Sequence, residues 1–436
     1  MFTYLRRELR ARLLARRADP PGDIATGDGA RATVPAASSS ASDSDSDSGS
    51  GFRATLALAL RAEAQGFSDI SAESREQALR AALVDYLHAD AVAVTGANLL
   101  LAAGSTALIL HIIRERCGRG RGSILIAEPG PSRYREAAVA LGVDVVPVGR
   151  ADDDLSIDLE DARARMAATR WRPRVSVVFV GHPNAPTGNP LISEELAWLR
   201  SLPHDVLVVI DEGYYEYAGN SLVAEAIRRP NWIVLRTLSR AFGLATHRVG
   251  YAVARADQII ALTRTRAPTV SSTAALVARI ALEHRHELLC RVPETRRQRR
   301  RVYQQLASAP AARSVRVWPS RCDSLFVRVA PQAASESQAS VLARRDIVVE
   351  RLAAAGFRVG AAADGLRVYV GDPDEDRQML AALERTLARW GHGSKRTRDA
   401  RRKRRFFSSS GSSGSSGSRS ASRPRAHASS SGSFAR

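Results

Sequence analysis

The chain has 436 residues, of which 44% are hydrophobic and 25% are charged, and its formal net charge is +19. This length suffices for two packed domains with a large apolar core. No uninterrupted apolar run approaches the roughly 20 residues that a membrane-spanning helix needs, so no membrane segment is expected. Three cysteines, Cys117, Cys290 and Cys322, lie far apart without metal-ligand spacing. They predict free structural thiols, a cytoplasmic location and no metal site.

The positive charge is concentrated at the two ends of the chain. Residues 1–17 hold six arginines and one glutamate, and residues 391–436 hold twelve Lys or Arg and one Asp. The rest of the chain is therefore close to neutral, which argues against a nucleic-acid-binding body. Only two lysines occur, Lys395 and Lys403, and both lie in the C-terminal segment.

Both end segments have the composition of flexible chain. Residues 1–50 pass from an Arg-rich stretch into a Ser-Asp repeat, which predicts a disordered basic arm. A targeting segment is the alternative, although an acidic repeat fits a transit peptide badly. Residues 391–436 join a basic cluster to Ser-Gly repeats and predict a flexible tail. Contact of the tails with a nucleic acid or another polyanion is one hypothesis, and a simply solvated charge run is the other.

Between the ends, apolar runs of strand length alternate with helical patterns. Six runs lie between residues 92 and 275, namely SILIAE (123–128), DVVPV (144–148), VSVVFVGH (175–182), DVLVVIDE (205–212), WIVLRTLS (232–239) and VGYAVA (249–254). Because such Val- and Ile-rich runs indicate strands buried on both faces, they predict an α/β domain with a mostly parallel sheet. Residues 276–390 predict a smaller α+β domain, which we expect residues 51–91 to join.

Three motifs at strand ends carry the strongest functional signal. They are HPNAPTG (182–188), DEGYYEY (211–217) and TLSRAFGLATHRVGY (237–251). Their order and spacing resemble the fold-type I aminotransferases that use pyridoxal 5′-phosphate, most of all those acting on histidinol phosphate. The resemblance runs from about Phe67 to Leu387. It implies a large cofactor domain, a smaller domain, an amino-acid-type substrate and a homodimer with the site at the subunit interface.

The resemblance assigns two groups of residues to the cofactor phosphate. Gly104, Ser105 and Thr106 stand where a strand turns into a helix, and the free N–H groups of a helix N-terminus attract an anion. An ordinary helix cap is the alternative for these three. Ser239 and Arg248 match a hydroxyl and a guanidinium that hold the same phosphate.

The ring of the cofactor is assigned to the second motif. Asp211 ends an apolar strand, where a carboxylate needs a cationic partner, and the resemblance makes that partner the pyridinium N–H. Capping of the next helix is the alternative. Tyr214 matches the tyrosine that bonds the phenolic oxygen. Ala185 replaces the asparagine that usually does the same, so Asn184, one residue earlier, is the candidate, with a turn that binds no ligand as the alternative.

Two further positions concern the ring face and the substrate. Pro131 stands where the family stacks an aromatic ring on the pyridine, with Tyr134 three residues later, so we expect weak stacking or merely a proline-shaped turn. Arg367, in the apolar run LRVYVG, matches the arginine that grips the substrate carboxylate. Arg358 lies near the position of a second family arginine, and we expect it to be structural.

Arg240 stands where the family has the lysine that forms the Schiff base. A guanidinium has a pKa above about 12 and serves neither as nucleophile nor as general base. Losing the base alone costs roughly 10²- to 10⁴-fold in rate. We therefore expect the usual Schiff-base transamination to fail, while pyridoxal or pyridoxamine phosphate is held without a covalent bond.

Three hypotheses follow for the whole protein. The first is a cofactor-dependent enzyme that acts on amino-acid-like substrates through non-covalently held pyridoxamine phosphate. The second is a pseudoenzyme with a binding or regulatory role. The third makes the basic tails the functional part and the body a dimerising scaffold.

Overall fold

The computed structural model describes residues 50–64, 71–88, 93–168, 173–265, 267–308, 314–333 and 335–388. The predicted basic arm, apart from Ser50, and the predicted tail lie outside these residues. The described residues up to Thr386 belong to one compact unit.

The larger sheet has seven strands in the order β1-β7-β6-β5-β4-β2-β3. The strands are β1 Leu99–Ala102, β2 Ser123–Ala127, β3 Val145–Val148, β4 Val175–Gly181, β5 Leu207–Asp211, β6 Trp232–Thr237 and β7 Gly250–Ala254. β7 runs antiparallel to its neighbours β1 and β6, and the other pairs are parallel. The six apolar runs therefore all form strands, and the α/β class is confirmed. The reversed direction of β7 was not predicted, because an apolar run carries no sign of strand direction.

Helices cover both faces of this sheet. They are α2 Ser50–Ala64, α3 Ala72–His88, η1 Gly96–Asn98, α4 Ser105–Cys117, α5 Ser132–Ala140, α6 Leu159–Ala168, α7 Ser193–Ser201, α8 Tyr215–Ala218, α9 Val223–Ala226, α10 Ala256–Thr263 and α11 Ser272–Glu283. On one face Leu207 and Val209 of β5 pack with α4 and α5, and on the other Val208 and Ile210 pack with α3, α7 and α11. Successive side chains of a strand point to opposite faces. The run is apolar throughout because both faces are covered.

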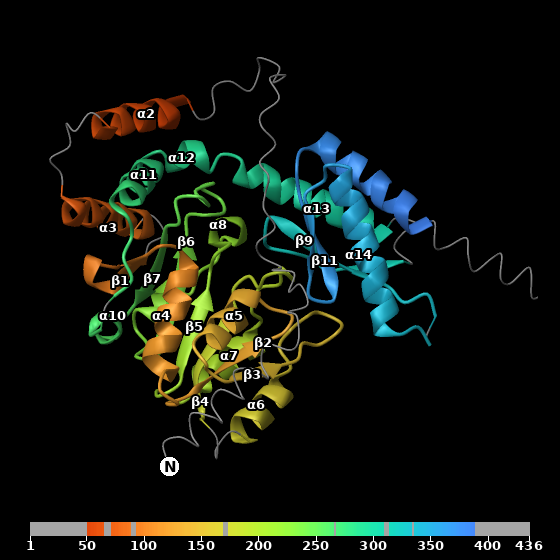
Figure 1. Ribbon diagram of the computed structural model, residues 1–436, viewed down its shortest axis with the longest axis horizontal. Coiled ribbons are helices and arrows are strands. Elements are labelled where there is room, and N and C mark those ends of the chain that lie inside the picture. The colour runs from red at the N-terminus through yellow and green to blue at the C-terminus, as the bar shows by residue number, and fades with distance from the viewer. Residues whose placement is uncertain are drawn as a thin grey trace, which may run out of the picture. The chain divides into compact units, whose positions relative to one another are not determined.

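The second sheet has four antiparallel strands in the order β10-β11-β9-β8. Its elements are α12 Arg285–Leu288, α13 Val292–Ser308, β8 Val315–Val317, β9 Ser324–Val329, α14 Gln338–Ala354, β10 Val359–Ala362 and β11 Gly365–Tyr369, and residues 373–388 are helical. Figure 1 shows α14 lying along β9 and β11. Arg367 of β11 lies opposite Phe326 of β9, and its side chain is buried.

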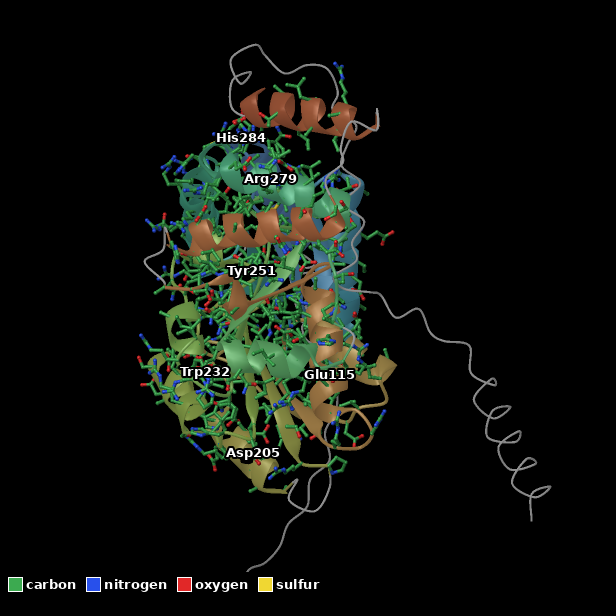
Figure 2. The ribbon with its side chains drawn as sticks, turned by 90° about the vertical axis from the view of Figure 1, so that its left-hand side faces the viewer. Glu115, Asp205, Trp232, Tyr251, Arg279 and His284 are labelled. Carbon is green, nitrogen blue, oxygen red and sulfur yellow. The ribbon has the colours of Figure 1, made fainter. Side chains whose placement is uncertain are left out.

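The segment before the first strand packs with the larger sheet. Leu79, Leu83 and Leu87 of α3 are fully buried in the core that the larger sheet builds. α2 and α3 both contact α11, and Figure 2 shows Arg279 and His284, near the end of α11, between them. We expected residues 51–91 to join the smaller domain. In the structure, the apolar face of α3 is covered by α11 and not by the four-stranded sheet.

Two sequence-based expectations concern single features of the fold. Among the residues described, no helix is both long and apolar enough to span a membrane. The three cysteines are free, with Cys117 and Cys322 buried and Cys290 exposed.

Candidate active site

The turn between β1 and α4 forms one end of the site. Gly104 has φ 83° and precedes the helix without any side-chain cap, so the first N–H groups of α4 remain available to an anion. A Cβ on Gly250 of β7 would lie 2.6 Å from the backbone nitrogen of Ser105. Only glycine permits this approach of β7 to the turn. Thr106 follows at the half-buried second position of the helix.

Arg248 lies against the same turn. A Cβ on Gly104 would come 2.7 Å from its Nη2 atom. The backbone of Arg248 has φ 52°, a left-handed conformation that costs a non-glycine residue roughly 1–3 kcal/mol. The side chain is exposed, and within the described ranges it has neither an ion pair nor a hydrogen bond. A strained, unpaired guanidinium beside an uncapped helix start is suited to binding a phosphate.

Ser239 follows the end of β6 close to this turn. Thr237 pairs with Gly250 across the sheet. The hydroxyl of Thr237 lies 2.9 Å from Oγ of Ser239 and accepts the Ser239 N–H at 3.2 Å. The bend that carries Ser239 is therefore fixed by a neighbouring hydroxyl.

Asp211, at the end of β5, has a cationic partner within the protein. Its Oδ2 accepts a hydrogen bond from Nη2 of Arg133 at 2.7 Å and one from the Tyr134 hydroxyl at 3.0 Å. Its Oδ1 accepts the Gly213 N–H at 3.0 Å. Both side chains are withdrawn from solvent, with exposed fractions of 3% for Asp211 and 15% for Arg133. The sequence indicated the need for a cation here but missed Arg133, which is one of many arginines in the chain.

Tyr214 is held between two arginines. The guanidinium carbons of Arg240 and Arg367 lie 5.2 Å and 5.3 Å from the centre of its ring, within the range of a cation–π contact. Nη2 of Arg367 also donates to the Tyr214 hydroxyl at 2.5 Å. Burial opposes the charge of Arg240, but Tyr214 and the Asp323 carboxylate outweigh it and raise the pKa of Arg240 above its ordinary value. Arg240 is therefore a permanent cation.

Arg367 is tied into the second sheet. Its Nε donates to Oγ of Ser324 at 2.7 Å, and its Nη2 lies 3.2 Å from a carboxylate oxygen of Asp323. Burial opposes its charge, and the phenol of Tyr214 with the carboxylate of Asp323 raises its pKa well above the ordinary value. The contact with Tyr214 makes Arg367 one of the links between the smaller sheet and the segment that follows β5. Asp323 and Ser324 were missed by sequence reasoning, since only the pairing of β9 with β11 brings them to Arg367.

The side-chain amide of Asn184 bonds the loop after β2 and its own turn. Its Nδ2 donates to the Pro129 carbonyl at 3.0 Å and to Oγ1 of Thr187 at 2.6 Å. The neighbouring Ala185 packs with Tyr214 and Cys322 in an apolar cluster. Asn184 is thus not brought together with Asp211 or Tyr214 by any side-chain bond among the described residues.

The candidates for ring stacking and for the second arginine have structural positions. Pro131 is the residue before α5. Tyr134 stacks on Phe179, with ring centres 4.9 Å apart. Arg358 donates to the Val370 carbonyl at 3.1 Å. Tyr134 thus packs on the sheet while its hydroxyl bonds Asp211.

The family model described as Aminotransferase class I and II matches residues 40–383. The chain belongs to this family. This match confirms the family that the sequence predicted, and the likeness to solved structures confirms the fold type.

Aminotransferases of one kind recur among its relatives. The chain is 40% identical over 285 residues to "Histidinol-phosphate aminotransferase" of Synechococcus elongatus, covering 65% of this chain and 73% of that one. It is 37% identical over 316 residues to "Histidinol-phosphate aminotransferase 2" of Nostoc, covering 71% and 80%. The solved histidinol-phosphate aminotransferase of Sinorhizobium meliloti, in complex with pyridoxal-5′-phosphate, superposes with a TM-score of 0.62 at 23% identity, covering 77% of this chain and 88% of that one.

The two ends of the site differ in how well they suit the family's cofactor. The phosphate end fits, since Gly104 leaves room for Arg248 above an uncapped helix start. The ring end does not fit in this conformation. Asp211 is already paired with Arg133, and the Tyr214 hydroxyl is bonded to Arg367.

Proposed function

We propose that this aminotransferase-family protein binds pyridoxal or pyridoxamine phosphate by its phosphate end, without a covalent bond, and does not carry out Schiff-base transamination. Its role is then to bind a phosphorylated ligand together with an amino-acid-type compound, as a binding or regulatory protein. This develops the second of the three hypotheses raised by the sequence.

One observation carries the proposal: the position of the family's lysine holds Arg240, which lies over the ring of Tyr214. A guanidinium does not attack an aldehyde or shuttle a proton between carbons. The nearest lysines along the chain are Lys395 and Lys403, in the C-terminal segment. No lysine stands within the residues that build the two sheets.

The phosphate end supports the binding half of the proposal. Arg248 offers a fork of donors that is not engaged by a carboxylate among the described residues. The start of α4 adds backbone N–H groups and the positive end of the helix dipole. Ser239 supplies a hydroxyl beside them. These groups recognise a phosphate monoester regardless of what the rest of the ligand contributes.

Substrate, assembly and location follow from the family and stay proposals. The relatives named histidinol-phosphate aminotransferase make phosphorylated amino compounds the first ligands to try, and Arg367 is the proposed anchor for a substrate carboxylate. We further propose a homodimer in the cytoplasm. Light scattering of the purified protein tests the dimer, since a monomeric mass would contradict it.

The central experiment separates binding from covalent attachment. Purified protein is titrated with pyridoxal phosphate, reduced with borohydride and digested for mass spectrometry. We expect saturable binding but no pyridoxyl group on any peptide from the body of the chain, and no amino transfer from histidinol phosphate or glutamate. A pyridoxyl group on the body, or transamination above the rate of the free cofactor, would contradict the proposal. Absence of any binding would show that the phosphate end is not a site.

A further inference from the structure

The pair formed by Arg133 and Asp211 places one of the protein's own cations at the carboxylate that would receive a cofactor's ring nitrogen. The distance between Nη2 and Oδ2 is 2.7 Å, and both side chains are largely buried. We propose that Arg133 is an internal competitor for a pyridinium and sets the ligand selectivity of the site. This inference rests on the proposed function, because it assumes that the phosphate end binds a ligand.

The hydrogen-bonding capacity of Asp211 is nearly used up. Oδ2 accepts from both Arg133 and the Tyr134 hydroxyl, and Oδ1 accepts from the Gly213 N–H. A carboxylate has about four acceptor positions, two on each oxygen. One position on Oδ1 therefore remains. A ring N–H would have to share this oxygen with the Gly213 N–H or displace Arg133.

Charge decides the matter more strongly than hydrogen-bond count. Asp211 supplies one negative charge, and Arg133 already neutralises it. A protonated pyridine beside the pair would meet a guanidinium that does not lose its proton, and like charges withdrawn from water repel strongly. The site therefore favours phosphorylated ligands whose ring is neutral or absent over a pyridinium.

Geometry holds Arg133 in this place. It lies in the first turn of α5, directly before Tyr134, which is 2% exposed and stacks on Phe179 of β4. The Tyr134 hydroxyl reaches the same oxygen of Asp211 as the guanidinium does. Tyr134 fixes the start of α5 against the sheet. The neighbouring Arg133 therefore lies close enough to Asp211 for its guanidinium to bond the carboxylate.

The test compares Arg133→Gln with Arg135→Gln. Arg135 is on the same helix and pairs with Glu128, but both side chains of that pair are 43% exposed. Calorimetric titrations use pyridoxamine phosphate, benzyl phosphate and inorganic phosphate. Benzyl phosphate carries a ring and a phosphate but no ring nitrogen. We expect Arg133→Gln to bind pyridoxamine phosphate at least tenfold more tightly than wild type, with the other two ligands unchanged, and Arg135→Gln to match wild type throughout.

Two results would overturn the inference. One is an unchanged or weakened affinity of Arg133→Gln for pyridoxamine phosphate. The other is an equal gain for benzyl phosphate, since that would mean Arg133 merely occupies space. If no phosphate ligand binds either protein, the proposed function fails as well, whereas equal binding of pyridoxamine phosphate by both proteins removes only the competition by Arg133.

A second variant guards against misfolding of the first. In an Asp211→Asn background no carboxylate is freed for the ring N–H, so Arg133→Gln should raise the affinity for pyridoxamine phosphate less than it does in the wild-type background. A gain of the same size in both backgrounds would contradict a role for Asp211. Should Arg133→Gln fail to fold, Arg133→Met supplies the same comparison with an apolar side chain.

Discussion

The guanidinium of Arg240 lies over the ring of Tyr214, with 5.2 Å between its central carbon and the ring centre. The family resemblance implies that the Tyr214 hydroxyl bonds the cofactor. The same tyrosine contacts Arg240, a cation that cannot form a Schiff base with the cofactor. Arg367 contacts the same ring from another element, β11. Arg240 and Arg367 therefore surround the ring of Tyr214 with two positive charges.

Arg240→Lys should restore covalent attachment. A lysine amine in this position can attack an aldehyde once it is deprotonated, and the positive charge of Arg367 favours the deprotonated amine. We expect borohydride reduction with pyridoxal phosphate to label Lys at position 240, and Arg240→Gln, the matched neutral variant, to remain unlabelled. An unlabelled Arg240→Lys protein that still binds the phosphate would show that the ring does not reach this residue.

Arg240→Lys combined with Arg133→Gln should transaminate faster than the single variants predict together. The first change supplies the base, and the second frees Asp211 to hold a protonated ring. Steady-state rates of the two single variants and the double variant form a cycle whose coupling term measures the cooperation. A strictly additive result would mean that Arg133 has no influence on the reacting ring.

Arg248→Gly should weaken phosphate binding without loss of stability. Removing a charge-assisted donor costs roughly 1.5–3 kcal/mol of binding, or about ten- to a hundredfold in affinity. The backbone at φ 52° is relaxed by glycine, and this gain of roughly 1–3 kcal/mol offsets the roughly 0.5–1 kcal/mol that the added chain entropy costs. Arg248→Ala, the comparison variant, keeps the strain. Titration with inorganic phosphate and urea unfolding check both halves, and a glycine variant less stable than the alanine variant would contradict this account.

Arg236→Met should be strongly destabilising. Nε of Arg236 lies 3.0 Å from Glu212, and these side chains are 1% and 0% exposed. Removing one partner strands a buried charge, at a cost of about 3–5 kcal/mol. Arg255→Ala removes one side of an exposed pair, Arg255–Asp257, and should cost under about 1 kcal/mol. Equal losses in urea unfolding for the two variants would refute the distinction, and Arg236→Met with Glu212→Gln should recover part of the loss.

Glu216 should make the protein less stable as the pH rises from about 4.5 to about 7. Burial raises the pKa of Glu216 from 4.5 to about 7. The folded state therefore holds the proton in this range while the unfolded state has released it, and stability falls by on the order of 3 kcal/mol as the pH increases. In Glu216→Gln this dependence should be missing. Urea unfolding of both proteins across this range checks it, and parallel curves would exclude Glu216 as the source.

The sequence alone determined the fold type and the family. The six apolar runs between residues 92 and 275 predicted strands buried on both faces of a sheet, because they are short and rich in Val and Ile. The ordered motifs around Asp211 and Arg240 identified the family because their spacing along the chain is itself the signal. The absence of a lysine from the body was also visible at once, as it depends only on residue identity.

Only the tertiary structure determined which side chains contact Asp211 and Arg367. Arg133, Asp323 and Ser324 carry no mark in the sequence, because an arginine in an Arg-rich chain and a serine at a strand start are ordinary residues. They gain a role when α5 brings Arg133 to the end of β5 and when β9 pairs with β11 beside Arg367. Contacts between residues distant along the chain depend on packing and register, and these are properties of the whole folded chain and not of any local pattern.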